Sequence, residues 1–147
     1  MPPFRSVAGD VAFGLASEET HKTKIAGFVG CDLTKDNNRY APFDYYNNDK
    51  TIYCELKTRR IPHNKYPTCL ISESKVLKAQ SDPTKTYYFF WAYEDGLFYL
   101  KYDPAVWSQF EVGPFKRWDR IDRVEKPHRH YFIPYESLVR IEGVSGG

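Results

Sequence analysis

The chain has 147 residues, of which 41% are hydrophobic and 17% are aromatic, and its formal net charge is +2. This length accommodates one domain with a buried core and excludes a second independent one, so we expect a single domain over residues 1–147. The small net charge excludes nucleic-acid binding through a bulk basic field, so any phosphate-binding surface must be local.

The N-terminal half of the sequence predicts a helix followed by a β-hairpin. Apolar residues recur at helical spacing over residues 11–25, and an irregular connection is expected over residues 27–38. Residues 40–46 and 51–58 are rich in aromatic and β-branched side chains, which favour strands. Because Asn and Asp tolerate left-handed backbone conformations, residues 47–50 are predicted to form the turn between these strands.

The central part of the sequence predicts a second helix and a second hairpin. Residues 72–80 begin with serines that can cap a helix and continue with apolar contact residues. Residues 86–93 are almost continuously apolar and aromatic, as in a strand covered on both faces. Residues 94–96 then turn the chain into a strand over residues 97–102.

The variable C-terminal segment extends over about residues 104–147. Its first proline, at a helix start, predicts a brief helix over residues 104–110. A strand is expected over residues 131–133 and a terminal helical turn over residues 134–139. Basic and acidic residues alternate over residues 116–129, which is typical of an exposed, self-paired surface, and the segment is too charged to be assigned to an element.

The order of helix, hairpin, helix and hairpin predicts an α/β fold with a mixed central β-sheet flanked by helices. The aromatic runs of the second hairpin are expected in the core, because central strands explain them better than stacking platforms for bases do. Trp107 and Trp118 lie outside the predicted strands and are expected at the surface or in an interface.

Sequence signals of secretion or membrane insertion are missing. No run of eighteen apolar residues occurs, and residues 1–10 lack a cationic head followed by an apolar stretch. The three cysteines, Cys31, Cys54 and Cys69, are an odd set without metal-ligand spacing, which indicates reduced thiols. We therefore expect an intracellular protein without a membrane partner, in the cytoplasm or, in a eukaryotic or viral setting, in the nucleus.

Three charged side chains fall on facing positions of the first predicted hairpin. Glu55 and Lys57 are separated by one strand residue, so the period of two places them on the same face. Asp44, on the preceding strand, can lie within a few ångströms of Glu55. Two adjacent carboxylates repel each other, and a hard divalent cation such as Mg²⁺ relieves that repulsion. The pattern therefore predicts a magnesium site beside a lysine that can act on a phosphate or an attacking water.

The residues Pro42-Phe43-Asp44, followed after ten residues by Glu55-Leu56-Lys57, resemble the PD-(D/E)XK signature of the restriction-endonuclease-like nuclease superfamily. Phe43, which separates the proline from the aspartate, departs from that pattern. The resemblance implies a restriction-endonuclease-like core and a metal-dependent nuclease that hydrolyses DNA phosphodiester bonds, with Mg²⁺ as cofactor and Mn²⁺ as substitute. The implied catalytic residues are Asp44, Glu55, Lys57 and Glu19, and the implied metal ligands are Asp44, Glu55, the carbonyl of Leu56, Glu19 and Glu18.

The same resemblance implies DNA as the partner. Arg59 and Arg60 leave the second strand beside the site, where guanidinium groups can hold phosphate oxygens. Ser74, Lys75 and Lys78 of the second predicted helix can add contacts, helped by the helix N-terminus. Analogy with small nucleases of this type implies a homodimer and structure-selective cutting in recombination or repair, as in Holliday junction resolvases, in a phage or virus.

Alternative interpretations stay open. An exonuclease or a single-strand or flap nuclease is nearly as well supported as a resolvase, whereas a sequence-specific restriction enzyme would need more chain to recognise bases. A non-catalytic nucleic-acid-binding or assembly module would explain Glu55 and Lys57 as a solvent-facing strand pair. In the same way, Glu18 and Glu19 would belong to a solvated helix face.

Overall fold

The computed structural model describes residues 20–38, 40–115 and 128–141. The strands are β1 (Leu33–Lys35), β2 (Tyr45–Asn47), β3 (Ile52–Thr58), β4 (Thr68–Ser72), β5 (Thr86–Tyr93), β6 (Gly96–Lys101), β7 (Glu111–Phe115), β8 (His128–Pro134) and β9 (Val139–Arg140). The helices are an N-terminal helix that includes residues 20–29, α2 (Glu73–Ser81), α3 (Pro104–Trp107) and the short 3-10 helix η2 (Tyr135–Ser137).

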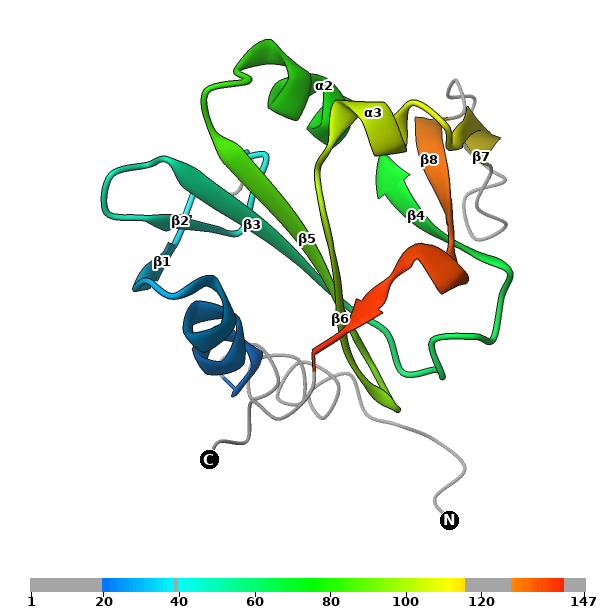
Figure 1. Ribbon diagram of the computed structural model, residues 1–147, viewed down its shortest axis with the longest axis horizontal. Helices are drawn as coiled ribbons and strands as arrows, with labels where there is room; N and C mark the ends of the chain where they lie inside the picture. The colour runs from blue at the N-terminus through cyan, green and yellow to red at the C-terminus, as the bar shows by residue number, and fades with distance from the viewer. Residues whose placement is uncertain (1–19, 39, 116–127, 142–147) are drawn as a thin grey trace.

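The strands form two sheets. The larger sheet has the order β1-β2-β3-β5-β6-β9, and the smaller has the order β4-β8-β7. β3 and β5 run parallel to each other, while the other neighbours of the larger sheet are antiparallel. This mixed sheet, with helices beside it (Figure 1), confirms the predicted α/β fold class.

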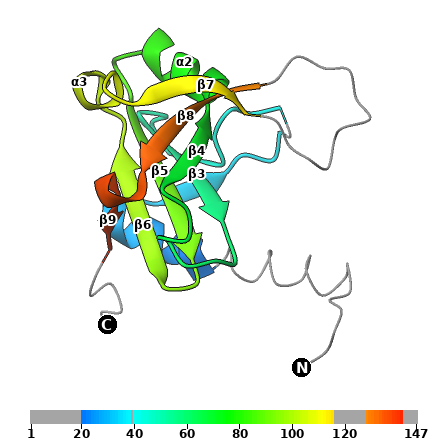
Figure 2. The ribbon, with the colours of Figure 1, turned by 90° about the vertical axis from the view of Figure 1, so that its right-hand side faces the viewer.

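The core lies on both faces of the larger sheet. Because side chains alternate along a strand, Phe89 and Trp91 of β5 face one side, and Phe90 and Ala92 face the other. The first cluster includes buried residues of α2, β4 and β8, whereas the second includes Ile25 of the N-terminal helix. The smaller sheet therefore packs over β3, β5 and β6 on one face, as Figure 2 shows, and the N-terminal helix covers the opposite face.

The first predicted hairpin is confirmed, with a correction to its first strand. β2 pairs with β3 in the register Tyr45↔Cys54, but it starts at Tyr45 and includes Asn47, which had been assigned to the turn. The Asn47 side chain explains this boundary, because its Oδ1 accepts hydrogen bonds from the backbone nitrogens of Thr51 and Ile52, at 2.8 and 3.0 Å. The side chain thereby closes the turn from within the strand.

The second hairpin and both later helices are also confirmed. β5 has the predicted bounds and pairs antiparallel with β6, while α2 is shifted by one residue from the predicted helix. α3 starts at Pro104, capped by the Asp103 side chain, which accepts a hydrogen bond from the nitrogen of Ala105. α3 ends at Trp107, three residues earlier than predicted. The predicted terminal helical turn is present as η2, preceded by the predicted strand in the longer β8.

Several predictions were wrong or fall outside the described residues. The N-terminal helix continues to residue 29, and β1 follows it, so residues 27–38 are not an irregular connection. The helix is followed by Gly30, whose φ of +85° suits glycine. The part of the predicted helix before residue 20 lies outside the described residues. β4, β7 and β9 were not predicted, and residues 116–127 lie outside the described residues.

The structure corrects the prediction that Trp107 lies at the surface or in an interface. Its side chain is 1% exposed and packs against Phe89 with ring centroids 4.9 Å apart. Its indole Nε1 donates a hydrogen bond to the carbonyl of Lys101, at 3.0 Å. The side chain therefore belongs to the core, and Trp118 lies outside the described residues.

The cysteines and the lengths of the helices complete the description of the fold. Cys31, Cys54 and Cys69 are all free, as expected for reduced thiols. Among the described residues, no helix has the length and apolar character needed to cross a membrane.

Candidate active site

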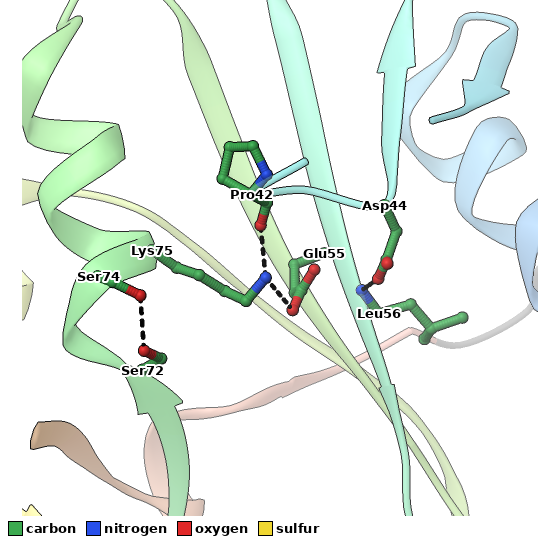
Figure 3. Close-up of polar contacts among 7 residues, drawn as sticks. All are labelled: Pro42, Asp44, Glu55, Leu56, Ser72, Ser74 and Lys75. Carbon is green, nitrogen blue, oxygen red and sulfur yellow. Dashed lines mark hydrogen bonds and ion pairs between the residues drawn. The ribbon is translucent and has the colours of Figure 1, made fainter. Parts of the chain in front are cut away.

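Asp44 and Glu55 converge at the open end of the β2–β3 hairpin. The register of the hairpin, continued by one residue beyond Tyr45↔Cys54, places Asp44 opposite Glu55. The Oδ2 atom of Asp44 accepts a hydrogen bond from the backbone nitrogen of Leu56, at 2.8 Å (Figure 3). This bond fixes the Asp44 carboxylate beside the strand that carries Glu55.

Glu55 is a buried carboxylate on the face of β3 that the smaller sheet and α2 cover. It is 5% exposed and lies in register with Phe89 of the core. Its Oε2 atom lies 2.9 Å from Nζ of Lys75. Within the described part of the chain, the buried Oε1 atom has no hydrogen-bond partner. A buried polar atom without a partner is costly, so this oxygen is available for a ligand.

The electrostatics of Glu55 reflect both burial and its acidic neighbour. Burial, as the larger cause, and the negative charge of Asp44 together raise the pKa of Glu55 to about 7, against the opposing effect of Lys75. The two carboxyl groups are close enough for a hydrogen bond, although two ionised carboxylates offer only acceptors, so such a bond needs a proton on one of them. The pair is therefore short of positive charge at neutral pH.

Lys75 is the cation that the structure places against this pair. It comes from the first turns of α2 and points across to the hairpin (Figure 3). Its Nζ atom donates a hydrogen bond to the carbonyl of Pro42, at 2.5 Å, and lies 6.0 Å from the ring centroid of Phe43. The sequence predicted Lys75 as a phosphate contact and gave no signal for an ion pair with Glu55.

Lys57 occupies the face of β3 predicted for it. It lies two residues after Glu55, in register with Trp91, and is half-buried. Lys57 and Arg59 are near enough to Cys69 of β4 to lower the pKa of its thiol, although burial dominates and raises that pKa to about 12. In the described residues, the ion pair of Glu55 is made with Lys75, and the catalytic role of Lys57 stays a prediction.

The predicted DNA contacts lie at two places. Just after β3, Arg59 is exposed and Arg60 is half-buried. Arg59 lies four residues after Glu55, which is roughly 13 Å along the chain at about 3.3 Å per residue. Ser74 and Lys78 are exposed on α2, and Oγ of Ser74 shares a hydrogen bond with Oγ of Ser72, at 2.8 Å. Of the five predicted DNA contacts, only Lys75 touches Glu55 in the described contacts.

Glu18 and Glu19, the predicted helical ligands, lie outside the described residues. Within the described residues, no cluster of three or more His, Cys, Asp or Glu side chains could hold a metal ion. The site contains the carboxylates of Asp44 and Glu55. It also contains the backbone of Leu56, which lies between Glu55 and Lys57 in the chain. This donor set fits Mg²⁺, which keeps several waters and binds through one or two carboxylates, and the unpartnered Oε1 of Glu55 supplies an open ligand position.

Comparisons with known proteins agree with the sequence resemblance. No curated protein matches the chain. The family described as "Phage putative PDDEXK endonuclease" matches residues 8–131, which include both halves of the signature, Asp44 and Glu55-Leu56-Lys57, together with α2. This match covers far more than half of the chain, and the chain therefore belongs to this PD-(D/E)XK endonuclease family.

Proposed function

We propose that the protein is a Mg²⁺-dependent endonuclease that hydrolyses phosphodiester bonds in DNA. The observation that carries the proposal is the buried carboxylate of Glu55, which faces the acidic Asp44 and keeps one oxygen without a partner among the described residues. A stable fold rarely retains such an arrangement unless a ligand completes it. Membership of an endonuclease family names the class of reaction.

The residues of the hairpin would hold the metal ion. Asp44 uses Oδ2 for the Leu56 nitrogen, which leaves its other oxygen for a cation beside the free Oε1 of Glu55. The carbonyl of Leu56 and a carboxylate of Glu18 or Glu19 would complete the protein ligands. When bound, Mg²⁺ would neutralise the carboxylates and lower the pKa of a coordinated water.

The lysines supply positive charge around that centre. Lys57 shares the face of Glu55, so its ammonium can orient the attacking water or stabilise the charge that develops on the phosphate. In-line attack by water then leaves a 3′-hydroxyl and a 5′-phosphate. Arg59, Arg60, Ser74 and Lys78 would hold neighbouring phosphates, because they flank the site on the strand exit and on α2.

A sequence-specific restriction enzyme would usually need more chain than these 147 residues to recognise bases. We therefore favour recognition of DNA shape, with Holliday junctions as the first candidate substrate and a homodimer as the active form. Flap or single-strand cutting, at ends or internally, is the second candidate. Mn²⁺ is expected to replace Mg²⁺.

The test is cleavage of four DNA substrates: supercoiled plasmid, linear duplex, single strand and a four-way junction. Each is incubated with Mg²⁺ or with a chelator, using the wild type, Glu55→Gln and Lys57→Ala. Glu73→Gln is the matched control, because Glu73 is a carboxylate of α2 paired with Arg129 rather than with the hairpin. Circular dichroism checks that every variant is folded.

The proposal predicts cleavage that needs Mg²⁺, is lost in Glu55→Gln and Lys57→Ala, and persists in Glu73→Gln. Cleavage confined to the junction would select the resolvase subclass. DNA binding without cleavage under Mg²⁺ and Mn²⁺ would favour a non-catalytic module. Cleavage that survives in Glu55→Gln would contradict the assigned site.

A further inference from the structure

Lys75 has contacts that phosphate binding does not explain. A lysine that serves a DNA backbone is expected to extend into solvent, as Lys78 does one turn later on α2. Lys75 instead is half-buried, with 23% of its side chain exposed, and its Nζ atom lies between Glu55 Oε2 and the Pro42 carbonyl. Both acceptors belong to the signature region of the hairpin.

The ammonium lies against the carboxylate whose other oxygen, Oε1, is the proposed metal ligand. It touches the Glu55 carboxylate at 2.9 Å, on the same buried face that Asp44 approaches. A cation held there neutralises part of the charge that burial makes costly. Two cations cannot share this carboxylate without strong repulsion, because the dielectric response of a buried site is weak.

We infer that Lys75 is a positioning residue that holds Glu55 in the metal-free enzyme and competes with the metal ion for that carboxylate. This inference rests on the proposed function. Its ammonium keeps the Glu55 side chain aligned beside Asp44 and lowers the affinity of the site for a divalent cation. When the site is loaded, Lys75 releases Oε2, and its ammonium is then free to face a substrate phosphate.

The competition predicts that a mutation inside the active site increases the affinity for the metal ion. Loss of the Lys75 charge leaves two carboxylates without a counter-ion and removes a cation that would repel the metal. Both effects favour metal binding. We expect Lys75→Met to bind Mn²⁺ at least about tenfold more tightly than the wild type, which corresponds to about 1.4 kcal/mol.

The experiment is a calorimetric titration of each DNA-free protein with Mn²⁺ at pH 8, above the pKa of Glu55 in the wild type. Lys75→Arg keeps the positive charge and should bind Mn²⁺ as weakly as the wild type. Lys24→Met is the matched control, since it removes an exposed lysine from the N-terminal helix on the opposite face of the sheet, and it should leave the affinity unchanged. Urea unfolding of each variant shows whether it is folded at the titration temperature.

The outcomes separate this inference from the proposed function. Tighter binding by Lys75→Met alone supports the competition, including the case in which the wild type binds no measurable Mn²⁺. Equal or weaker binding by Lys75→Met overturns the competition while the metal site itself stands, provided that Glu55→Gln abolishes binding. If neither the wild type nor Lys75→Met binds Mn²⁺, the competition and the metal site are both wrong.

Discussion

Replacing Glu55 by Gln should stabilise the metal-free protein at pH 8, although Glu55 is one of the most buried polar side chains among the described residues. Gln has nearly the same shape and removes the charge that burial and Asp44 disfavour. The pKa of Glu55 rises from 4.5 to about 7 on folding, which corresponds to about 3 kcal/mol of stability that the wild type lacks at pH 8.

The sign of this effect defines its pH window. Between pH 4.5 and about 7, the folded protein retains a proton on Glu55 that the unfolded chain has released. The free energy of unfolding of the wild type therefore falls as the pH rises through this window, relative to that of Glu55→Gln. Below pH 4.5 both proteins carry a neutral side chain at this position, and their stabilities should converge.

The assay is urea unfolding of both proteins in chelator at pH 4, 6 and 8, because urea does not screen charges. Glu73→Gln serves as the control, since its partly exposed ion pair with Arg129 should contribute no more than about 1 kcal/mol at any pH. A Glu55→Gln variant that is no more stable than the wild type at pH 8 would refute the reasoning. So would a difference that does not change with pH.

Two further predictions concern activity and DNA binding. Asp44→Asn should abolish cleavage. It should leave the fold intact, because the amide oxygen can still accept the hydrogen bond from the Leu56 nitrogen. Cleavage assays and circular dichroism measure both effects, and an unfolded variant would contradict the prediction. Arg59→Ala should weaken DNA binding and make its salt dependence shallower, by about one in the slope of log K against log salt. Fluorescence anisotropy at several salt concentrations measures that slope. The control is Lys24→Ala, an exposed lysine on the opposite face of the sheet. An unchanged slope in Arg59→Ala would show that Arg59 does not contact DNA.

The parts of the fold that the sequence predicted are those in which local signals and tertiary packing agree. β3 and β5 are runs of β-forming residues, and both lie in the centre of the larger sheet, as their near-continuous apolar character requires. α2 starts after Ser72, one of the two predicted cap residues, although the Ser72 side chain makes no capping hydrogen bond. These elements carry Glu55, Lys57 and Lys75, so the site could be located early.

The smaller sheet depends on contacts that a local pattern does not contain. β4 is five residues long, follows a proline-marked loop and runs directly into α2, so its strand character comes from pairing with β8, more than fifty residues later. β7 includes Gly113 and Pro114, which are poor strand formers, and it is held by β8 in the same way. Trp107, at the end of α3, is buried because it packs against Phe89 of β5 and Tyr131 of β8.

The candidate site shows the same division. The period of two along β3 and the turn between the strands sufficed to predict that Asp44 and Glu55 converge. The ion pair between Lys75 and Glu55 could not be predicted, because it depends on how α2 crosses the face of the sheet. Lys75 follows Glu55 by twenty positions in the sequence, and no spacing rule links the two side chains.

The central claim is that Asp44 and Glu55 share a divalent cation, and diffraction from crystals soaked in Mn²⁺ tests it most directly. An anomalous peak within coordinating distance of both carboxylates, at about 2.2 Å from their oxygens, is the predicted result. A crystal that binds Mn²⁺ elsewhere, or that leaves both carboxylates without metal at saturating Mn²⁺, would contradict the claim.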